Sequence, residues 1–254
     1  MPTVIVNGRA VGYRKPEVAK GHVVLLVHGA YDNGDYWQHV YPHLARAHTP
    51  IAVDLPGRRE SEGPPIDDAA GYARFFPALA DALKLPPFVF FGHSMGGSMA
   101  VDFAARNPMR TKAVIALGSA PRWSTSQADI DKWDSDPEGA FGENLDYLFA
   151  KGGASASVRA AYDRQLRTTP PMTCQADIAH CRGVAMEGRL DQVKAPTLVV
   201  AGDEEAWIDG SHALRDGIAG AQFEVIPGAG HAVALEQPAA LNVAVDRFLK
   251  TLTV

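Results

Sequence analysis

The sequence predicts an α/β protein with a mostly parallel, doubly wound sheet and a helical insertion, which we call the cap. Two observations predict the sheet: short continuous apolar runs recur along the chain, and helical stretches separate most of them. Apolar runs of this length are typical of strands buried on both faces, and their alternation with helices is typical of doubly wound sheets. A third observation, one long break in the alternation, predicts the cap. The apolar runs occupy residues 22–27, 51–53, 88–91, 113–117, 197–201 and 223–226.

The chain opens with a predicted β-hairpin ahead of these runs. Apolar residues alternate with polar ones on both sides of the pair Asn7-Gly8, which favours a tight turn. The alternating apolar positions are Val4, Val6, Val11 and Tyr13.

Three helices are predicted between and after the runs. The first covers about residues 67–83, begins at one of two capping aspartates and carries an apolar stripe. The second follows the run at 88–91 and ends near residue 106, where Asn107-Pro108 stops it. The third covers about residues 238–248 and begins with a proline, which the first turn of a helix tolerates.

The break in the alternation predicts the domain organisation. Residues 121–191 are richer in Asp, Ser, Gly and Pro, and their only periodicity is helical. A connection of about 70 residues is far longer than a crossover between parallel strands requires. We therefore predict a core formed by residues 1–120 and 192–254, with a cap of several helices, residues 121–191, placed over the sheet.

Composition and charge exclude several classes of protein. The 254 residues include 24 Lys plus Arg and 29 Asp plus Glu, a net charge of −5 without a basic block, which argues against nucleic acid as a partner. The apolar runs are far shorter than the roughly 20 residues that cross a bilayer, and the N-terminus lacks the pattern of a signal peptide. Cys174 and Cys181 form neither a CxxC pair nor a disulfide framework. We predict a cytoplasmic protein with free thiols, a small-molecule substrate, and neither nucleic acid nor membrane as a partner.

The segment Gly92-His93-Ser94-Met95-Gly96 has the pattern G-x-S-x-G between a predicted strand and a predicted helix. That context favours a nucleophilic serine on a sharp, strained turn, where side chains two residues to either side would collide. The N-terminus of the following helix offers unpaired N–H groups and a positive dipole end to a developing oxyanion. We predict that Ser94 is a catalytic nucleophile; the alternative is a structural glycine-rich turn.

With this motif the chain resembles the α/β-hydrolase superfamily, and the resemblance covers nearly all of it outside the cap. A second matching segment is His28-Gly29-Ala30, directly after the run at 22–27. In the superfamily such a segment supplies a backbone N–H to the oxyanion hole. The resemblance therefore implies that the N–H groups of Ala30 and Met95 hold the oxyanion. The alternative for His28-Gly29 is a turn that only ends a strand.

The resemblance also implies a general base and an acid. His231 follows the last predicted strand and a glycine-rich loop, where the superfamily places its base. Superfamily members often have an acid three residues past a glycine after the preceding strand, and counting from Gly202 gives Glu205. Asp203 and Glu204 remain alternatives. The order serine, acid, histidine along the chain is the order of this superfamily.

One further segment, residues 54–61, departs from the superfamily pattern D-x-x-G-x-G-x-S. Arg59 stands where the pattern has its second glycine, so the loop either avoids a positive φ there or strains Arg59. We expect Arg58 and Arg59 to lie on a solvent-exposed loop, because arginines are mostly exposed. The alternative is that they face an acidic group of the substrate.

The resemblance implies a serine hydrolase without cofactor or metal that cleaves an ester, thioester or lactone of a small apolar acid through an acyl-enzyme on Ser94. Two alternatives use the same triad, an acyl-homoserine-lactone-type lactonase and a carbon–carbon bond hydrolase. A third, of another class, is a ligand-binding receptor on a hydrolase scaffold. Candidate pocket residues are Tyr31 and Trp123, with Trp133, Phe141 and Tyr147 as further cap aromatics, each of which has core packing as its alternative.

Overall fold

A computed structural model describes residues 1–253, without the side chains of residues 144 and 146. The described residues form one sheet of eight strands in the order β1-β2-β4-β3-β5-β6-β7-β8. The predicted hairpin and all six predicted runs are strands of this sheet. Their bounds are β1 Thr3–Val6, β2 Arg9–Arg14, β3 Val23–Val27, β4 Thr49–Val53, β5 Phe88–His93, β6 Thr111–Leu117, β7 Thr197–Gly202 and β8 Gln222–Ile226.

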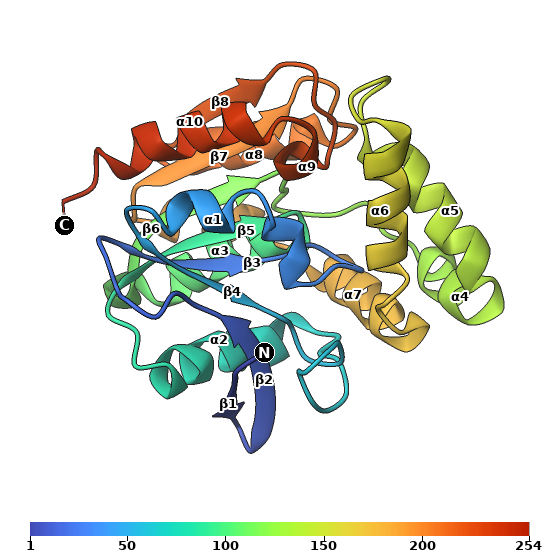
Figure 1. The fold of residues 1–254 in the computed structure, drawn as a ribbon, viewed down its shortest axis with the longest axis horizontal. Coiled ribbons are helices and arrows are strands. Elements are labelled where there is room, and N and C mark those ends of the chain that lie inside the picture. Colours follow the sequence, from blue (N-terminus) through green and yellow to red (C-terminus); the bar gives the residue numbers. More distant parts are fainter. Residues whose placement is uncertain (254) are drawn as a thin grey trace.

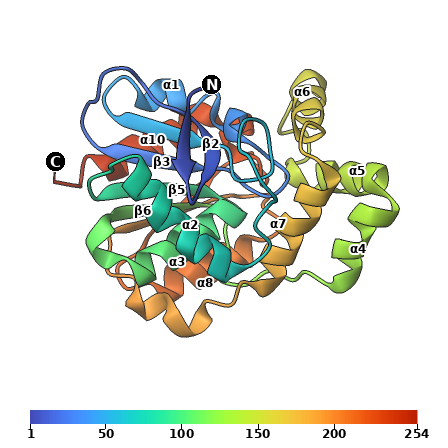
Figure 2. The same ribbon diagram turned by 90° about the horizontal axis from the view of Figure 1, so that it is seen from below.

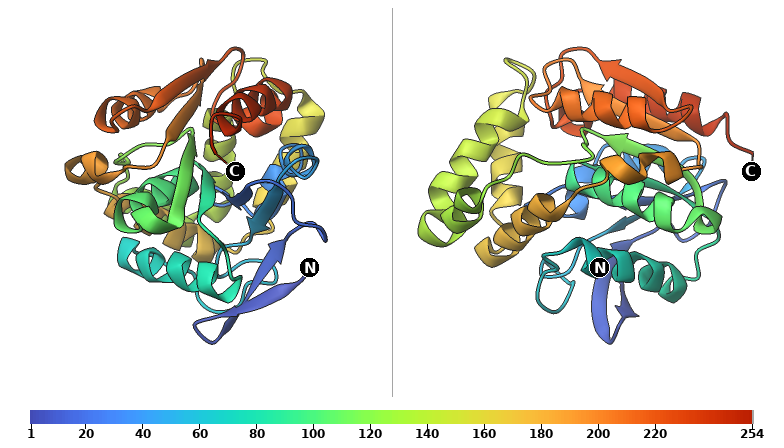
Figure 3. Two further views of the ribbon diagram at one scale, coloured as in Figure 1. Left: turned by 90° about the vertical axis from the view of Figure 1, so that its left-hand side faces the viewer. Right: turned by 180° about the vertical axis from the view of Figure 1, so that it is seen from behind.

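The sheet is mostly parallel, as the sequence predicts. Strands β1 and β2 pair antiparallel, and β2 pairs antiparallel with β4, whereas the pairings from β4 through β3, β5, β6 and β7 to β8 are parallel. The hairpin lies at one edge of the sheet and β8 at the other (Figure 3). Because these strands are parallel, their carboxyl ends lie together at one end of the strands, which is where open α/β sheets bind ligands.

Helices cover both faces of the sheet. Side chains of β3 alternate between two apolar clusters: Val24 and Leu26 join one, and Leu25 and Val27 join the other. The first cluster includes α1 and α10, and the second includes α2, α3 and α8, so the two sets lie on opposite sides of the strands (Figure 2). The core helices are α1 Tyr41–Leu44, α2 Ala69–Ala82, α3 Met95–Arg106, α8 Ile208–Gly217, α9 Val233–Glu236 and α10 Pro238–Leu249, with short 3-10 turns at Gly34–Trp37 and Pro108–Arg110.

The long break in the alternation contains helices only. Between β6 and β7 the chain forms α4 Gln127–Ser135, α5 Pro137–Leu148, α6 Ala156–Leu166, α7 Pro171–Gly183 and a 3-10 turn, Glu187–Gln192. Figure 1 shows α4 to α7 gathered at one end of the sheet. The two connections to the core run side by side, since Arg122 and Ala185 form an antiparallel bridge and the Met186 N–H donates to Pro121 O at 3.0 Å.

The structure bears on the predicted free thiols and on the predicted absence of a membrane-spanning segment. Cys174 and Cys181 are both free and buried. Within residues 1–253, every helix is too short or too polar to cross a bilayer. The cytoplasmic location stays a prediction.

Candidate active site

The carboxyl edge of the sheet brings together residues that lie far apart in the chain. Ala30 lies in the loop after β3, Ser94 follows β5, Glu205 lies after β7, and His231 lies between β8 and α9. Ala30, Ser94 and His231 line one cleft of about 260 Å³, which opens toward α4 and α5. Glu205 lies behind His231 and is buried. The predicted site residues therefore meet at one place.

Ser94 occupies a strained turn between β5 and α3. Its backbone angles are φ 53° and ψ −119°, a conformation that a residue with a side chain adopts only where the surroundings impose it. The flanking glycines are required, because a Cβ on Gly92 would lie 2.0 Å from Gly96 O and a Cβ on Gly96 would lie 2.5 Å from Val27 O. The turn leaves Ser94 partly exposed in the cleft, while its neighbours are buried.

Among the three acids after β7, Glu205 is the one that contacts His231. Both carboxylate oxygens of Glu205 lie 2.9 Å from His231 Nδ1, and both residues are buried. Asp203 instead accepts the backbone N–H groups of Gly228 and Ala229, at 2.7 and 3.3 Å. Glu204 accepts the backbone N–H of Lys151 at 3.0 Å.

The Glu205 contact sets the chemistry that His231 can perform. An imidazole that donates its Nδ1–H to a carboxylate presents a lone pair on Nε2, which is the atom that accepts a proton. In residues 1–253 no hydrogen bond joins the Ser94 hydroxyl to His231, although both line the cleft. The ring of His93, the residue before Ser94, packs 4.7 Å from the His231 ring, and His93 Nε2 lies 3.0 Å from His231 O. His93 therefore contacts the loop that carries the imidazole.

Two backbone N–H groups near Ser94 have no hydrogen-bond partner in the part of the chain that the structure describes. Met95 is the first residue of α3, and Ala30 lies between β3 and the 3-10 turn at Gly34–Trp37. Within the described part of the chain neither N–H donates a hydrogen bond, whereas the next one, of Tyr31, donates to Asp177 Oδ2 at 2.8 Å. Unpaired amides at a helix N-terminus and in a neighbouring loop suit an anionic oxygen.

Aromatic side chains line part of the cleft, together with the charged side chains of Asp129, Lys132 and Glu143. Tyr31 and Trp123 both line it, as do Trp133 and Tyr147, whereas Phe141 is buried and packs 4.9 Å from the Trp133 ring. Of the further cap aromatics, Phe141 is thus a packing residue. Flat aromatic rings beside a reactive centre suit a substrate that carries an apolar group.

Sequence reasoning missed Trp207, which contacts both members of the Glu205–His231 pair. Its backbone N–H donates to Glu205 Oε1 at 3.2 Å, and its ring meets the His231 ring edge-on at 4.9 Å. Trp207 also lines the cleft. The available signal was its position two residues after the favoured acid.

The structure overturns the expectation for Arg58. Its side chain is buried against Asp177 of α7, with Nη2 2.7 Å from Oδ1 and Nη1 3.1 Å from Oδ2. Burial of a charged side chain is stable only with such a partner. Arg59 is exposed as expected, and it adopts the strained alternative with φ 49°, where Nη1 contacts Asp35 Oδ2 at 2.6 Å.

A second buried carboxylate, Asp32, joins the loop after β3 to α6. Tyr162 donates its hydroxyl to Oδ2, and Gln165 donates its amide to Oδ1, each at 2.6 Å. Burial raises the pKa of Asp32 from 3.8 to about 7, although the hydrogen bonds from Tyr162, the Asn33 N–H and Gln165 oppose the shift. Asp32 therefore titrates near neutral pH.

Asp32→Asn should remove a pH dependence from the stability of the protein. Between pH values near 3.8 and about 7, folded Asp32 keeps a proton that the unfolded chain has lost, so the wild type loses stability as the pH rises. One such proton gives a slope of up to about 1.4 kcal/mol per pH unit. Denaturant unfolding of both proteins at several pH values across this window should show the unfolding free energy of the wild type falling with rising pH relative to that of Asp32→Asn. Parallel pH profiles would contradict the titration.

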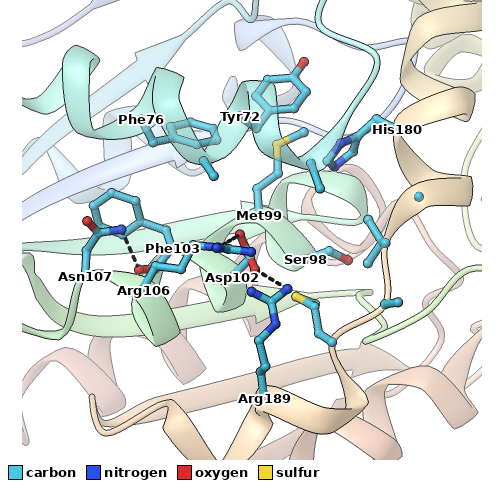
Figure 4. A pocket seen from close by; sticks show the side chains of 16 residues that line it. Tyr72, Phe76, Ser98, Met99, Asp102, Phe103, Arg106, Asn107, His180 and Arg189 are labelled. Carbon is cyan, nitrogen blue, oxygen red and sulfur yellow. Dashed lines mark hydrogen bonds and ion pairs between the residues drawn. The ribbon is translucent and has the colours of Figure 1, made fainter.

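A smaller cavity lies on the other side of α7, between α2 and α3 (Figure 4). It holds about 50 Å³, room for a few water molecules. Its serine, Ser98, is engaged on both sides, since its hydroxyl donates to Ala120 O at 2.7 Å and accepts the Trp123 Nε1–H at 3.0 Å. At its mouth Asp102 pairs with Arg106 and Arg189, each at 2.8 Å. Its size and its engaged serine distinguish it from the cleft at Ser94.

Comparison with known proteins identifies the family to which this chain belongs. The sequence model of the alpha/beta hydrolase family matches residues 24–244. Carboxylesterase YbfK of Bacillus subtilis is 25% identical over 244 residues, which cover 89% of this chain and 79% of the relative. The 2-hydroxy-6-oxo-6-phenylhexa-2,4-dienoate hydrolase of Burkholderia cepacia is 25% identical over 259 residues, 89% of this chain and 87% of the relative. The solved structure of Est816, described as an N-acyl homoserine lactone degrading enzyme, is 26% identical, with a TM-score of 0.86 over 97% of this chain and 100% of Est816. Because the family model matches most of its length, this chain belongs to the alpha/beta hydrolase family.

Proposed function

We propose that the protein is a serine hydrolase that cleaves an ester, thioester or lactone of a small apolar acid through an acyl-enzyme on Ser94. The observation that carries the proposal is the convergence on one cleft of a serine on a strained turn and a histidine that a buried glutamate holds. In this reading Glu205 is the acid of the triad. Membership of a hydrolase family supports the reaction class.

The positions of Ser94, His231, Ala30 and Met95 support the reaction that we propose. His231 takes the proton of the Ser94 hydroxyl through Nε2, and the Ser94 oxygen attacks the carbonyl carbon of the substrate. The N–H groups of Ala30 and Met95 hold the resulting oxyanion. Collapse expels the alcohol or thiol, which takes the proton from His231. Water then loses a proton to His231 and attacks the acyl carbon. Collapse breaks the bond to the Ser94 oxygen, which takes the proton back from His231, and the acid leaves.

The aromatic side chains of the cleft support the proposed substrate class. Residues 121–191 act in this proposal as a cap whose aromatic side chains, with Tyr31 and Trp207, surround an apolar acyl or alcohol group. A lactone is a cyclic ester and passes through the same steps, with the leaving alkoxide still attached to the acyl chain. The likeness to Est816 supports lactones as a second substrate group.

The two remaining candidates have less support. One relative is named as a dienoate hydrolase, which keeps a carbon–carbon substrate in the test set. A receptor without turnover needs neither a glutamate behind His231 nor unpaired amides beside Ser94, so both features argue against it.

The decisive experiment traps the acyl-enzyme. Esters, thioesters, lactones and a vinylogous diketone are each mixed with the protein and quenched in acid, and intact and peptide masses are recorded. We expect the protein to gain the mass of the acyl group on the peptide that contains Ser94. Turnover with the acyl group on another residue, or no turnover of any substrate class, would contradict the proposal.

A further inference from the structure

We infer that Arg58 and Asp177 are positioning residues for the oxyanion hole, because together they hold the backbone at Tyr31, the residue after Ala30. The inference rests on the proposed function, since it assigns these residues a part in the same reaction. Neither side chain lines the cleft, so neither touches the substrate.

The backbone at Tyr31 needs to be held. Tyr31 has φ 67°, in the left-handed region that favours glycine, and it is not a glycine. Such a conformation persists only where several contacts impose it. If Tyr31 relaxed, the preceding residue would turn with it, and the Ala30 N–H would leave the direction of the oxyanion.

Asp177 holds the peptide between Ala30 and Tyr31. Its Oδ2 accepts the Tyr31 N–H at 2.8 Å, which fixes the plane of that peptide. Asp177 is fully buried on α7, in the cap, so the contact is protected from water. A carboxylate that accepts a backbone N–H in such a place is a strong partner.

Arg58 completes the arrangement from the other side of Tyr31. Its Nη1 donates to Asp32 O at 2.9 Å and its guanidinium contacts both oxygens of Asp177. One arginine therefore orients the carboxylate that holds the Tyr31 N–H and also binds the carbonyl of the next residue. The backbone on both sides of the strained residue is fixed by the same ion pair.

A purely stabilising role explains this pair less well. A buried ion pair gains little over apolar side chains of similar volume, because taking two charges out of water offsets their attraction. The polar atoms of this pair bind the backbone that follows Ala30. That backbone lies beside the oxyanion hole, where the direction of each N–H donor matters. Because Asp177 lies on α7, the backbone of the oxyanion hole is held in place only when α7 packs against the core.

The double variant Arg58→Met/Asp177→Leu tests the inference without leaving a buried charge. We expect kcat for an ester to fall about 10- to 100-fold with KM nearly unchanged, as for donors that act in the transition state. The pH dependence of kcat/KM should keep its midpoint, because His231 and Glu205 are untouched. The ratio of the ester rate to the thionoester rate should also fall. The ester rate drops in the variant, whereas the thionoester rate stays nearly the same, because the sulfur of a thionoester accepts hydrogen bonds weakly and gains little from the oxyanion hole in either protein.

The control is Asp102→Asn/Arg189→Gln, which removes a pair that also joins core to cap but does not touch residues 30–33. It should keep both kcat and the ester to thionoester ratio. Circular dichroism verifies the fold of each protein. If the double variant does not fold, Asp177→Ala decides, because alanine cannot accept the Tyr31 N–H, and an unchanged ratio in that variant overturns the inference. An unchanged kcat and ratio in a folded double variant overturns it as well, while activity that does not depend on Ser94 would refute the proposed function instead.

Discussion

Replacing Ser94 by alanine should lower kcat/KM for the best ester substrate by about 10⁵- to 10⁶-fold. Alanine has no oxygen to attack the carbonyl carbon, so the acyl-enzyme cannot form and His231 has no proton to accept. The amides of Ala30 and Met95 would still bind the substrate oxygen, so activity should remain above the rate in water by about 10³-fold. A series of p-nitrophenyl esters of increasing chain length measures the loss.

Ser98→Ala is the matched control for this loss. Ser98 lies about one turn further along the chain, in α3, and is buried. Its hydroxyl bonds to Ala120 O and Trp123 Nε1 and does not line the cleft. The variant loses two neutral hydrogen bonds, each of which contributes about 1 kcal/mol to the free energy of unfolding. Neither bond involves a reacting atom, so kcat/KM should change by less than tenfold. Equal rates for wild type and Ser94→Ala on every chain length would refute the enzyme reading.

The fold could be predicted because its signals are local. A strand buried on both faces needs a short continuous apolar run, and the runs at β3, β5 and β6 contain little else. The turn at Ser94 was predictable for the same reason. Gly92 and Gly96 have no room for a side chain, because atoms a few residues away or on the adjacent strand lie too close. The choice of Glu205 was also local, because it depended only on counting three residues from Gly202 within one loop.

The contacts between residues 121–191 and the rest of the protein could not be predicted, because they join residues far apart in the chain. Arg58 and Asp177 are separated by 119 positions, and no local pattern marks an arginine that will be buried. The same holds for Asp32, whose partners Tyr162 and Gln165 lie on α6. The expectation of a solvated Arg58 followed the usual behaviour of arginine, and the partner from α7 reversed it.

Glu205→Gln should lower kcat by about 10⁴-fold, the second largest effect that we expect. Glutamine keeps the shape of the side chain, but only one of its two polar atoms accepts a hydrogen bond. The Trp207 N–H donates to Glu205 Oε1, so it would attract the amide oxygen. The amide nitrogen would then face His231 Nδ1 and donate to it, which places the remaining proton on Nε2, where the lone pair is needed.

Asp203→Asn is the matched control, since it makes the same change of acid to amide two residues earlier. Asp203 binds the N–H groups of Gly228 and Ala229 through Oδ1, and an asparagine oxygen can accept both. That variant should therefore keep kcat within about tenfold, with a small loss of stability. Rates measured on one ester, with both variants shown to be folded, separate the two acids. A loss of orders of magnitude in Asp203→Asn and not in Glu205→Gln would mean that the loop after β7 rearranges and that Asp203 is the acid that serves His231.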